Sequence, residues 1–532
     1  MRREPLYNCV MRICLISREY PPETGFGGIA TFTKHLAHGL ALNGHDVEVV
    51  TLAKEQERTY VEAVGESADG GKSITIHRVL PYNFHTGLDC VNMAMPYSRY
   101  LICTSTALWR KFAERHAFKP FDAVDTPELL AEGIYPALTK VAPMVVRLYT
   151  PHSKFIAEKL HNVRPSFDHQ FVAMVERVAM LSCDVITSPS DDLAEFVAND
   201  LGIKQESICI VRNPINTAVF SPEGEKALPD PADGKLRVLF VGRLEERKGI
   251  NYLVAAIPEV IKEFPAVEFV IIGDDTNTAQ GQTSVLKGLK ETLSQTRTLD
   301  KVTFIDRVPL DALPSYYRSA DICIVPSVYD NSPYTCLESM SCGRAVIGTS
   351  AGGTKEYMIH QESGLIIPAR DTGAIKEALL TLLQDPQERA RLAQGARKRA
   401  VEKFDRCEIA RQTAELYKLA QANHRDQTDL KQLYRHQYQQ ALADAEDFLN
   451  AMDRMLYDML FQYSYRFRIN HWWRHLKARP RFFLCKFLLK ALKIAHLPLG
   501  KKAATSSPLI RKLEDKIQEA DRLAQSSRNG DH

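Results

Sequence analysis

The stretch "LRVLFVGRLEERKGINYLVAAIPEVIKEF", residues 236–264, joins an apolar run of strand length to a helical pattern through a turn that contains glycine. The same succession begins earlier with "VMRICLIS" (10–17), the glycine-rich "GFGGIA" (25–30) and a helical pattern through about Asn43. Short strands that alternate with helices are typical of a parallel sheet covered by helices. The sequence therefore predicts two Rossmann-like, doubly wound α/β domains that face each other across a cleft.

The chain has 532 residues, which is too long for one ordinary domain. Residues 220–235, "FSPEGEKALPDPADGK", are rich in Pro and Gly and show no apolar period, which is typical of a linker. From about Gln421 no strand pattern is visible, and the sequence becomes helix-forming and charged. We therefore expect an N-terminal domain over 1–219, a linker, a second domain over 236–420 and a helical extension over 421–532.

Composition indicates the class of protein. Hydrophobic residues make up 45% and charged residues 25% of the chain, as in a soluble globular protein. The 11 Cys are scattered without a CxxC pair, which favours a reducing compartment over a disulfide framework. The segment before Arg18 has no long apolar core, so a signal peptide is not expected, and no apolar run reaches about 18 residues. We predict a cytoplasmic location.

A basic segment near the C-terminus stands out. From Arg466 to Lys502 there are eleven Lys and Arg and no Asp or Glu. Subtracting these charges from the net charge of +3 leaves about −8 for the rest of the chain. Aromatic residues such as Trp472 and Phe487 are interleaved with the cations. This pattern suits an interfacial helix on anionic lipid, peripheral on the cytoplasmic membrane face, or a helical hairpin packed on the catalytic body or on a second subunit of a homo-oligomer. A nucleic-acid partner is a third, less favoured interpretation.

The stretch "PSVYDNSPYTCLESMSCGRAV", residues 326–346, contains a short helix with recognisable ends. Ser332 is expected to be its N-cap and Pro333 its first helical residue, since both residue types are favoured there. Gly343 lies where a left-handed C-terminal cap is expected. The N-terminus of such a helix offers free N–H groups and partial positive charge to an anion.

Two carboxylates flank that helix start. Asp330 precedes it and Glu338 lies further along the same helix. Carboxylates accept hydrogen bonds, so they suit the hydroxyls of a sugar or ribose. The same pair also fits the acid and nucleophile of a glycoside hydrolase, provided that the two carboxyls flank a sugar.

Cationic and glycine-rich segments offer a phosphate site. "VGRLEERKG" (241–249) places Arg243 after a strand and Lys248 at the start of a helix, at the sheet edge where α/β proteins bind ligands. Arg and Lys both hold phosphate oxygens. Gly27 and Gly28 allow close approach of the backbone to a ligand. The alternatives are a tight turn for the glycines and a solvated charged loop for the cations.

Several motifs in order resemble the retaining glycosyltransferases of family four, the group of sucrose synthases and of bacterial mannosyl- and glucosyltransferases, which have the GT-B fold. The resemblance covers roughly 11–418. It rests on "EYPPETGFGGIATFTKHLAHGLALNGHDVEVVT" (19–51), "TPHS" (150–153), "VRNPINTAVFSP" (211–222), "VGRLEERKG" (241–249) and "DNSPYTCLESMSCG" (330–343). Together these motifs imply a GT-B protein with an added helical C-terminal extension.

The resemblance implies roles on the phosphate side of the donor. Arg243 and Lys248 would hold the donor diphosphate and stabilise the leaving group. Gly27 and Gly28 would shape the loop near the diphosphate and the acceptor.

It also implies roles on the sugar side. Glu338 would bind the nucleoside ribose, and Asp330 the hydroxyls of the transferred sugar. Asn331 and Ser332 would belong to the donor site as well. His152 would lie near the donor sugar and the acceptor.

The function implied is transfer of a hexose from a UDP-, GDP- or ADP-sugar to a glycolipid, polysaccharide or small-molecule acceptor, with retention of configuration. No Asp-x-Asp motif is present in the sequence, and no metal or other cofactor is expected. Asp330 stands where the family's E-x7-E motif has glutamate, which leaves a catalytically inactive scaffold as an alternative. A glycoside hydrolase is the second alternative, but it does not explain Arg243 and Lys248.

Overall fold

The structure is a computed structural model. It describes residues 10–25, 27–65, 71–83, 94–159, 166–231, 234–278, 283–425, 452–457, 469, 488–489, 512 and 514–516. The chain divides into two compact units, Met1–Gly87 with Met95–Ala445 and Leu88–Ala94 with Glu446–His532. Both α/β domains belong to the first unit. The lipid, hairpin and nucleic-acid interpretations of Arg466–Lys502 concern a segment that lies almost wholly outside the described residues. None of the helices in the described parts of the chain combines the length and the apolar character that a bilayer crossing requires.

Eight strands of the described chain form the first sheet, in the order β3-β4-β2-β1-β5-β6-β7-β8. They are β1 (Arg12–Ile16), β2 (Asp46–Leu52), β3 (Arg58–Val64), β4 (Lys72–Val79), β5 (Ala123–Pro127), β6 (Met144–Arg147), β7 (Val185–Ser188) and β8 (Ile208–Ile210). Neighbouring strands are parallel except β3, which pairs antiparallel with β4 at the edge of the sheet. The strand–helix pattern of the sequence does not predict this edge hairpin, since an antiparallel neighbour needs no crossover helix.

The second sheet is wholly parallel. Within 234–425, its six described strands follow the order β11-β10-β9-β12-β13-β14. They are β9 (Leu236–Val241), β10 (Val267–Ile272), β11 (Val302–Ile305), β12 (Ile322–Val325), β13 (Ala345–Thr349) and β14 (Leu365–Ile367). The prediction of two doubly wound α/β domains is confirmed.

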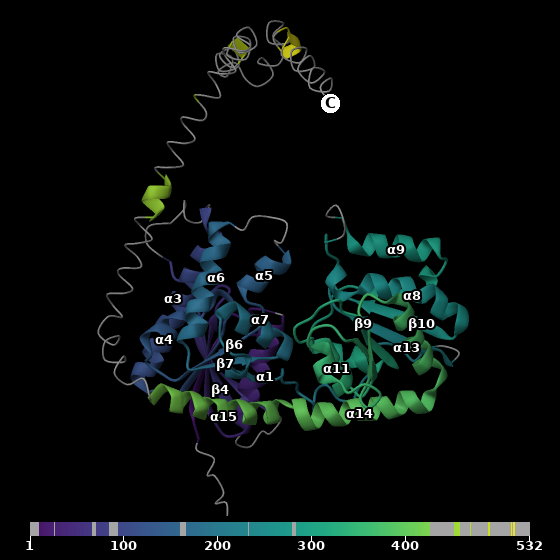
Figure 1. Ribbon diagram of the computed structural model, residues 1–532, viewed down its shortest axis with the longest axis horizontal. Helices are drawn as coiled ribbons and strands as arrows, with labels where there is room; N and C mark the ends of the chain where they lie inside the picture. Colours follow the sequence, from purple (N-terminus) through teal and green to yellow (C-terminus); the bar gives the residue numbers. More distant parts are fainter. Residues whose placement is uncertain are drawn as a thin grey trace, which may run out of the picture. The chain divides into compact units, whose positions relative to one another are not determined.

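Helices connect the strands (Figure 1). The described helices of the first domain are α1 (Gly28–Leu42), α3 (Pro96–Phe118), α4 (Ile134–Thr139), α5 (His152–Lys159), α6 (Phe167–Ser182) and α7 (Asp191–Leu201). Those that follow are α8 (Ile250–Glu263), α9 (Val285–Gln295), α10 (Leu313–Arg318), α11 (Tyr334–Ser341), α12 (Thr354–Tyr357), α13 (Thr372–Gln384), α14 (Pro386–Phe404) and α15 (Arg406–Arg425). Their ends follow local chemistry: the Ser190 side chain accepts from the Leu193 N–H at the start of α7, and Gly202 ends α7 with a φ of +69°.

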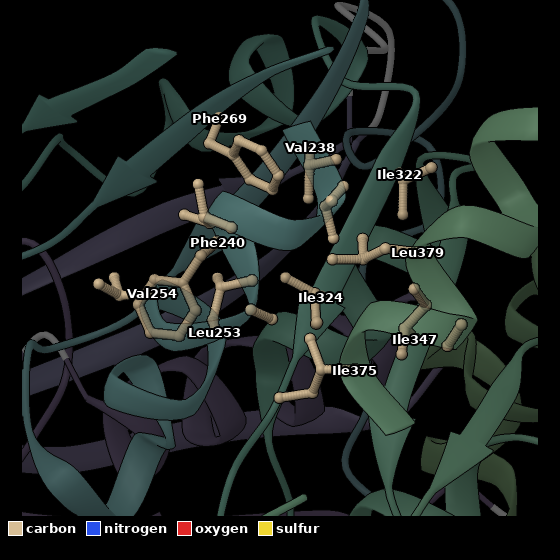
Figure 2. Packing of buried hydrophobic residues seen from close by; sticks show 14 of the residues in the cluster. Val238, Phe240, Leu253, Val254, Phe269, Ile322, Ile324, Ile347, Ile375 and Leu379 are labelled. Carbon is tan, nitrogen blue, oxygen red and sulfur yellow. The ribbon is translucent and has the colours of Figure 1, made fainter. Parts of the chain in front are cut away.

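The core of the second domain fixes the loop that carries the predicted phosphate-binding cations. Figure 2 shows Phe240 of β9 beside Leu253 and Val254 of α8, with Ile324 of β12 and Leu379 of α13 in the same buried cluster. A fully buried side chain of this kind contributes roughly 1.5–3 kcal/mol. Because β9 and α8 are both held by this cluster, the loop between them is held at the carboxyl end of the sheet.

The chain crosses between the two domains twice, and the two crossings lie side by side. The Ile215 N–H donates to the carbonyl of Phe404 at 2.8 Å, and the Arg406 N–H donates to the carbonyl of Ile215 at 2.8 Å. The second crossing therefore leads out of α14 and into α15, which packs against α1, β6 and β7 of the first domain. The domain boundaries drawn from the sequence stay predictions.

Close backbone contact and a buried polar group hold α15 in place. A Cβ atom on Gly39 of α1 would lie 2.2 Å from the carbonyl oxygen of Arg406. The Tyr417 hydroxyl donates to the Asp125 carboxylate at 2.8 Å, and Arg147 pairs with the same carboxylate at 3.0 Å. Helix α15 is thus an integral part of the first domain.

Replacing Gly39 with alanine is expected to lower the free energy of unfolding by about 1–3 kcal/mol, because the added methyl group must push α1 and α15 apart. Urea unfolding of the full chain measures the change. Gly288, in the middle of α9, is the matched control: a Cβ atom there meets nothing within 4 Å. G288A should be neutral or stabilising by about 0.5–1 kcal/mol. Equal effects of the two variants would contradict the close packing of α15.

Candidate active site

A cleft of about 590 Å³ is lined by both α/β domains. The first domain contributes Gly27, Gly28 and Thr31 at the start of α1, and the second contributes the loops at the carboxyl ends of its strands. The remaining lining residues are Val241, Gly242, Arg243, Arg247, Lys248, Ile272, Gly273, Asp274, Arg307, Val308, Leu310, Leu313, Asp330, Ser332, Pro333, Tyr334, Thr335 and Glu338. This volume is within the range of small-molecule sites, about 300–1,000 Å³.

The two cations predicted from "VGRLEERKG" both line the cleft. The Arg243 side chain is 61% exposed and lies 3.3 Å from the Glu245 carboxylate, so its guanidinium is accessible to a ligand. Lys248 is the last residue of a 3₁₀ turn (Glu246–Lys248), and Gly249 follows with a φ of +70° before α8 begins. A Cβ atom on Gly249 would lie 1.8 Å from the carbonyl oxygen of Pro326, so only glycine fits there.

Lys248 is bound to one of the two predicted carboxylates. Its ammonium donates to Asp330 at 2.5 Å, and the Arg247 guanidinium lies 3.8 Å from the other oxygen of that carboxylate. Burial alone would raise the pKa of Asp330, but the charges of Lys248 and Arg247 outweigh it and lower the pKa below its ordinary value. Asp330 is therefore ionised at neutral pH.

Glu338 has a different environment. It is fully buried in α11 and accepts a hydrogen bond from the Tyr317 hydroxyl at 2.7 Å. Burial raises the pKa of Glu338 to about 7, against the weaker opposing effects of the Tyr317 hydrogen bond and of the Lys248 charge. The two predicted acids thus line one cleft with pKa shifts of opposite sign.

Two helix N-termini reach the cleft. Gly27 is the N-cap of α1 and Pro333 the N-cap of α11, and neither helix has a side-chain cap hydrogen bond. A Cβ atom on Gly27 would meet nothing within 4 Å, so the space beside this helix start is left open. Uncapped N–H groups at such an opening suit an anion.

The start of α11 differs from the prediction. Ser332 is not the N-cap, Pro333 is not the first helical residue, and the helix begins at Tyr334. The physical reason is that Pro333 has a ψ of 118°, outside the helical region, and that the Ser332 hydroxyl bonds to the Tyr357 hydroxyl instead of to α11. The prediction for the other end is confirmed, since Gly343 has a φ of +64° and its N–H donates to the Met340 carbonyl.

His152 does not line the cleft. Its imidazole is buried, with Nε2 2.8 Å from Nδ1 of His169, and its main-chain N–H donates to Glu176 at 2.6 Å. Burial, with a further contribution from His169 and against the opposing charge of Asp168, lowers the pKa of His152 to about 4. The side chain is therefore neutral at physiological pH.

Asn331 does not line the cleft either. Its amide NH₂ donates to the Tyr149 carbonyl at 2.6 Å and to the Thr150 hydroxyl at 2.8 Å, both in the first domain. Asn331 and His152 are thus the two predicted site residues that do not line the cleft. They lie on either side of one contact between the domains, because Asn331 bonds to Thr150, which is two residues before His152.

Two further cations line the cleft that the sequence pattern does not single out, Arg247 and Arg307. Arg247 is adjacent to Lys248 in the sequence and contacts the carboxylates of Glu245 and Asp330. Arg307 follows β11 by two residues, and its guanidinium lies 3.8 Å from Asp274. The sequence nevertheless contains an indication of both residues, because each lies in a loop that follows the carboxyl end of a strand, where ligands of parallel sheets bind.

Comparison with known proteins gives two family matches. A model described as "Glycosyltransferase Family 4" matches residues 26–219, and one described as "Glycosyl transferases group 1" matches residues 225–399. Glycogen synthase of Mycobacterium tuberculosis is 25% identical over 421 residues, which are 78% of this chain and 96% of that protein.

Solved structures with the same arrangement of domains are also found. Sucrose-phosphate synthase from Thermosynechococcus elongatus has a TM-score of 0.59 at 22% identity, covering 77% of this chain and 98% of that one. HepE of Anabaena in complex with UDP-glucose has a TM-score of 0.53 at 16% identity, covering 76% and 99%. At these identities the likeness shows a shared fold.

Changing Glu338 to glutamine is expected to alter how stability depends on pH. Because the folded protein holds the Glu338 proton more tightly than the unfolded chain, this group stabilises most below about pH 4.5, and its contribution falls as the pH rises to about 7. Glutamine does not titrate. From pH 5 to pH 8, E338Q should therefore gain roughly 2–3 kcal/mol of unfolding free energy relative to the wild type.

Urea unfolding at the two pH values measures the difference. Glu291, whose side chain is 61% exposed, is the control. The unfolding free energy of E291Q should differ from that of the wild type by the same amount at both pH values. A difference between E338Q and the wild type that stays constant from pH 5 to pH 8 would show that Glu338 does not carry a raised pKa.

Proposed function

Because the chain belongs to the glycosyltransferases of family four and has the GT-B fold, we propose that it transfers a hexose from a nucleoside-diphosphate sugar to an acceptor, with retention of anomeric configuration and without a metal ion. The acceptor is a glycolipid, a polysaccharide or a small molecule. The donor base is that of UDP, GDP or ADP. The proposed site of action is cytoplasmic, and a glycolipid or surface-polysaccharide acceptor fits the basic segment 466–502.

One observation carries the proposal: the uncapped start of α1 and the cations of the second domain line the same cleft. Gly27 and Gly28 come from one domain, and Arg243 and Lys248 from the other. A diphosphate carries more negative charge than one helix N-terminus can neutralise. It therefore suits a site that combines a helix N-terminus with cationic side chains. HepE, whose structure holds UDP-glucose, supports the same class of donor.

The chemistry follows from where charge develops. Cleavage of the bond between the anomeric carbon and the phosphate oxygen transfers negative charge to the nucleoside diphosphate. Arg243 and Lys248 would stabilise that charge as it forms, which is where fixed cations contribute most. Because this chain's own cations supply the counter-charge, the proposed reaction needs no divalent ion.

The carboxylates are assigned to the hydroxyls of the donor. Asp330, ionised and fixed by Lys248, would accept hydrogen bonds from the transferred sugar. Glu338, deeper in α11, would accept hydrogen bonds from the ribose. Asp330 is held between two cations and Glu338 by a neutral tyrosine, and in these roles neither acts as a hydrolytic acid or nucleophile.

Replacing Arg243 and Lys248 together with alanine is expected to weaken nucleoside-diphosphate binding at least about 100-fold, since each removed cation forfeits charge-assisted hydrogen bonds worth about 1.5–3 kcal/mol. Calorimetric titration with UDP, GDP and ADP gives the affinities. Release of nucleoside diphosphate from a panel of sugar nucleotides, with an extract as the source of acceptors, gives the turnover, and EDTA should leave it unchanged.

The single variant R243A keeps the Lys248–Asp330 ion pair. A loss of nucleotide affinity in R243A therefore reports on binding and not on a disturbed Asp330 loop. K287A removes a 77% exposed lysine of α9 and is the control. Unchanged affinity and turnover in the double variant, or loss of turnover in EDTA, would refute the cation-based mechanism. Tight nucleotide binding without turnover of any donor would favour the inactive scaffold.

Retention is tested on the product. Leaving-group departure on the side from which the acceptor attacks should give a product with the same anomeric configuration as the donor. Proton NMR of the isolated product distinguishes the anomers by the coupling of the anomeric proton. An inverted product would overturn this part of the proposal while leaving the donor site intact.

A further inference from the structure

The two residues that flank Asp330 in the sequence both reach across to the first domain. The Tyr329 hydroxyl lies 2.6 Å from the Asp192 carboxylate of α7. It also lies 2.7 Å from the side-chain oxygen of Asn331, and its one hydrogen is shared between these two acceptors. Asn331 in turn donates to Tyr149 and Thr150. A continuous set of hydrogen bonds thus joins the Asp330 loop to the segment that leads into His152.

A buried lysine completes this contact. The Lys154 side chain, in α5, is 5% exposed, and its ammonium lies 3.7 Å from Asp192. The same ammonium lies 4.6 Å from the ring centre of Phe196 in the first domain and 4.6 Å from that of Tyr329 in the second. Burying a lysine charge is costly unless anions or ring faces replace its water. Part of that replacement comes from the other domain, since the Tyr329 ring is one of the groups that compensate the buried charge.

The second domain holds the same loop from its other side. The Tyr329 carbonyl accepts from Arg247 at 3.1 Å, and the Asp330 carbonyl accepts from the Gly353 N–H at 2.8 Å. A Cβ atom on Gly352 would lie 2.2 Å from the Asp330 carbonyl oxygen, and one on Gly353 would lie 2.0 Å from that of Asn331. The backbone around Asp330 is therefore in close contact with the Gly352–Gly353 turn of the second domain.

We propose that Tyr329, Asn331, Asp192 and Lys154 form an interdomain latch of positioning residues that holds the Asp330 loop in register with the segment carrying His152. The latch rests on the proposed function in one respect, because its expected effect is on the rate of sugar transfer. The affinity for the donor nucleotide would be determined by the residues that line the cleft. The reason is geometric. Arg243, Lys248 and Glu338, which are most of the groups assigned to the donor, belong to one domain, and only the start of α1 comes from the other. Transfer requires groups of both domains in fixed positions.

Hydrogen–deuterium exchange of the full chain tests the latch without any activity. Y329F keeps the ring that faces Lys154 and removes only the hydroxyl. D192N alters the partner on the other domain. Each is expected to speed exchange of residues 148–157, across the interface from Tyr329, by about threefold or more. The double variant should be no faster than D192N alone, since D192N weakens both the Tyr329 hydrogen bond and the Lys154 ion pair of Asp192, and Y329F removes the first of these.

Tyr252 of α8, half-buried and away from the interface, gives the matched control Y252F, which should leave residues 148–157 unchanged. Two results would overturn the latch. One is faster exchange confined to the second domain, and the other is an increase in the exchange rate of the double variant equal to the product of the increases in Y329F and D192N.

Turnover and binding separate the latch from the proposed function. Y329F should lower kcat about tenfold, with the dissociation constant of the best-binding nucleoside diphosphate among UDP, GDP and ADP changed less than about twofold. An equal loss in affinity and kcat would place Tyr329 in the donor site and overturn the latch. The exchange result and the turnover result can also differ. Faster exchange of residues 148–157 in Y329F and D192N, with no further increase in the double variant, would support the latch even if no donor were turned over. The lack of turnover would then refute only the proposed transferase activity.

Discussion

The ion pair between Lys248 and Asp330 is the interaction on which the organisation of the cleft depends. It joins the loop after β9 to the loop after β12, two neighbouring strands of the second sheet. Asp330 is almost fully buried, and a buried carboxylate is costly unless cations and hydrogen bonds surround it. Once Lys248 is committed to Asp330, the positions of the phosphate-binding loop and of the helix α11 that follows are fixed together. A ligand that recruits Lys248 therefore also acts on Asp330.

Connections of different kinds join the two domains in the described part of the chain. They include two covalent crossings, beside each other at Ile215 and at Phe404–Arg406, the latch of side chains around Tyr329, and the Arg212–Glu356 ion pair. The crossings are held by main-chain hydrogen bonds, which tolerate sequence change. The latch depends on particular side chains, among them a buried ammonium that needs partners from both domains. The crossings can therefore act as a fixed connection while the latch decides how well the two halves of the site are registered.

Much of the fold could be predicted from the sequence because the deciding signals are local. Strand–glycine–helix units set both domains, and loops at strand ends located Arg243, Lys248 and Asp330 beside one cleft. What local signals do not reveal depends on contacts between distant residues. The return of α15 to the first domain depends on the lack of a side chain at Gly39, which no periodicity reveals. The placement of Asn331 depends on Tyr149, 182 residues away. The N-cap of α11 was displaced by one residue because Tyr357 binds the Ser332 hydroxyl.

The spacing of Asp330 and Glu338 has a physical explanation in their surroundings. The loop position gives Asp330 two cations and keeps it ionised. Burial of Glu338 in the helix raises its pKa to about 7, against the Tyr317 hydrogen bond and the Lys248 charge. A hydroxyl that donates to a carboxylate stabilises its charged form and lowers its pKa. If Glu338 binds a ribose, as proposed, ligand binding and release of its proton must be coupled near neutral pH. One helix start thus separates an acid that is ionised at neutral pH from an acid whose pKa lies near that pH.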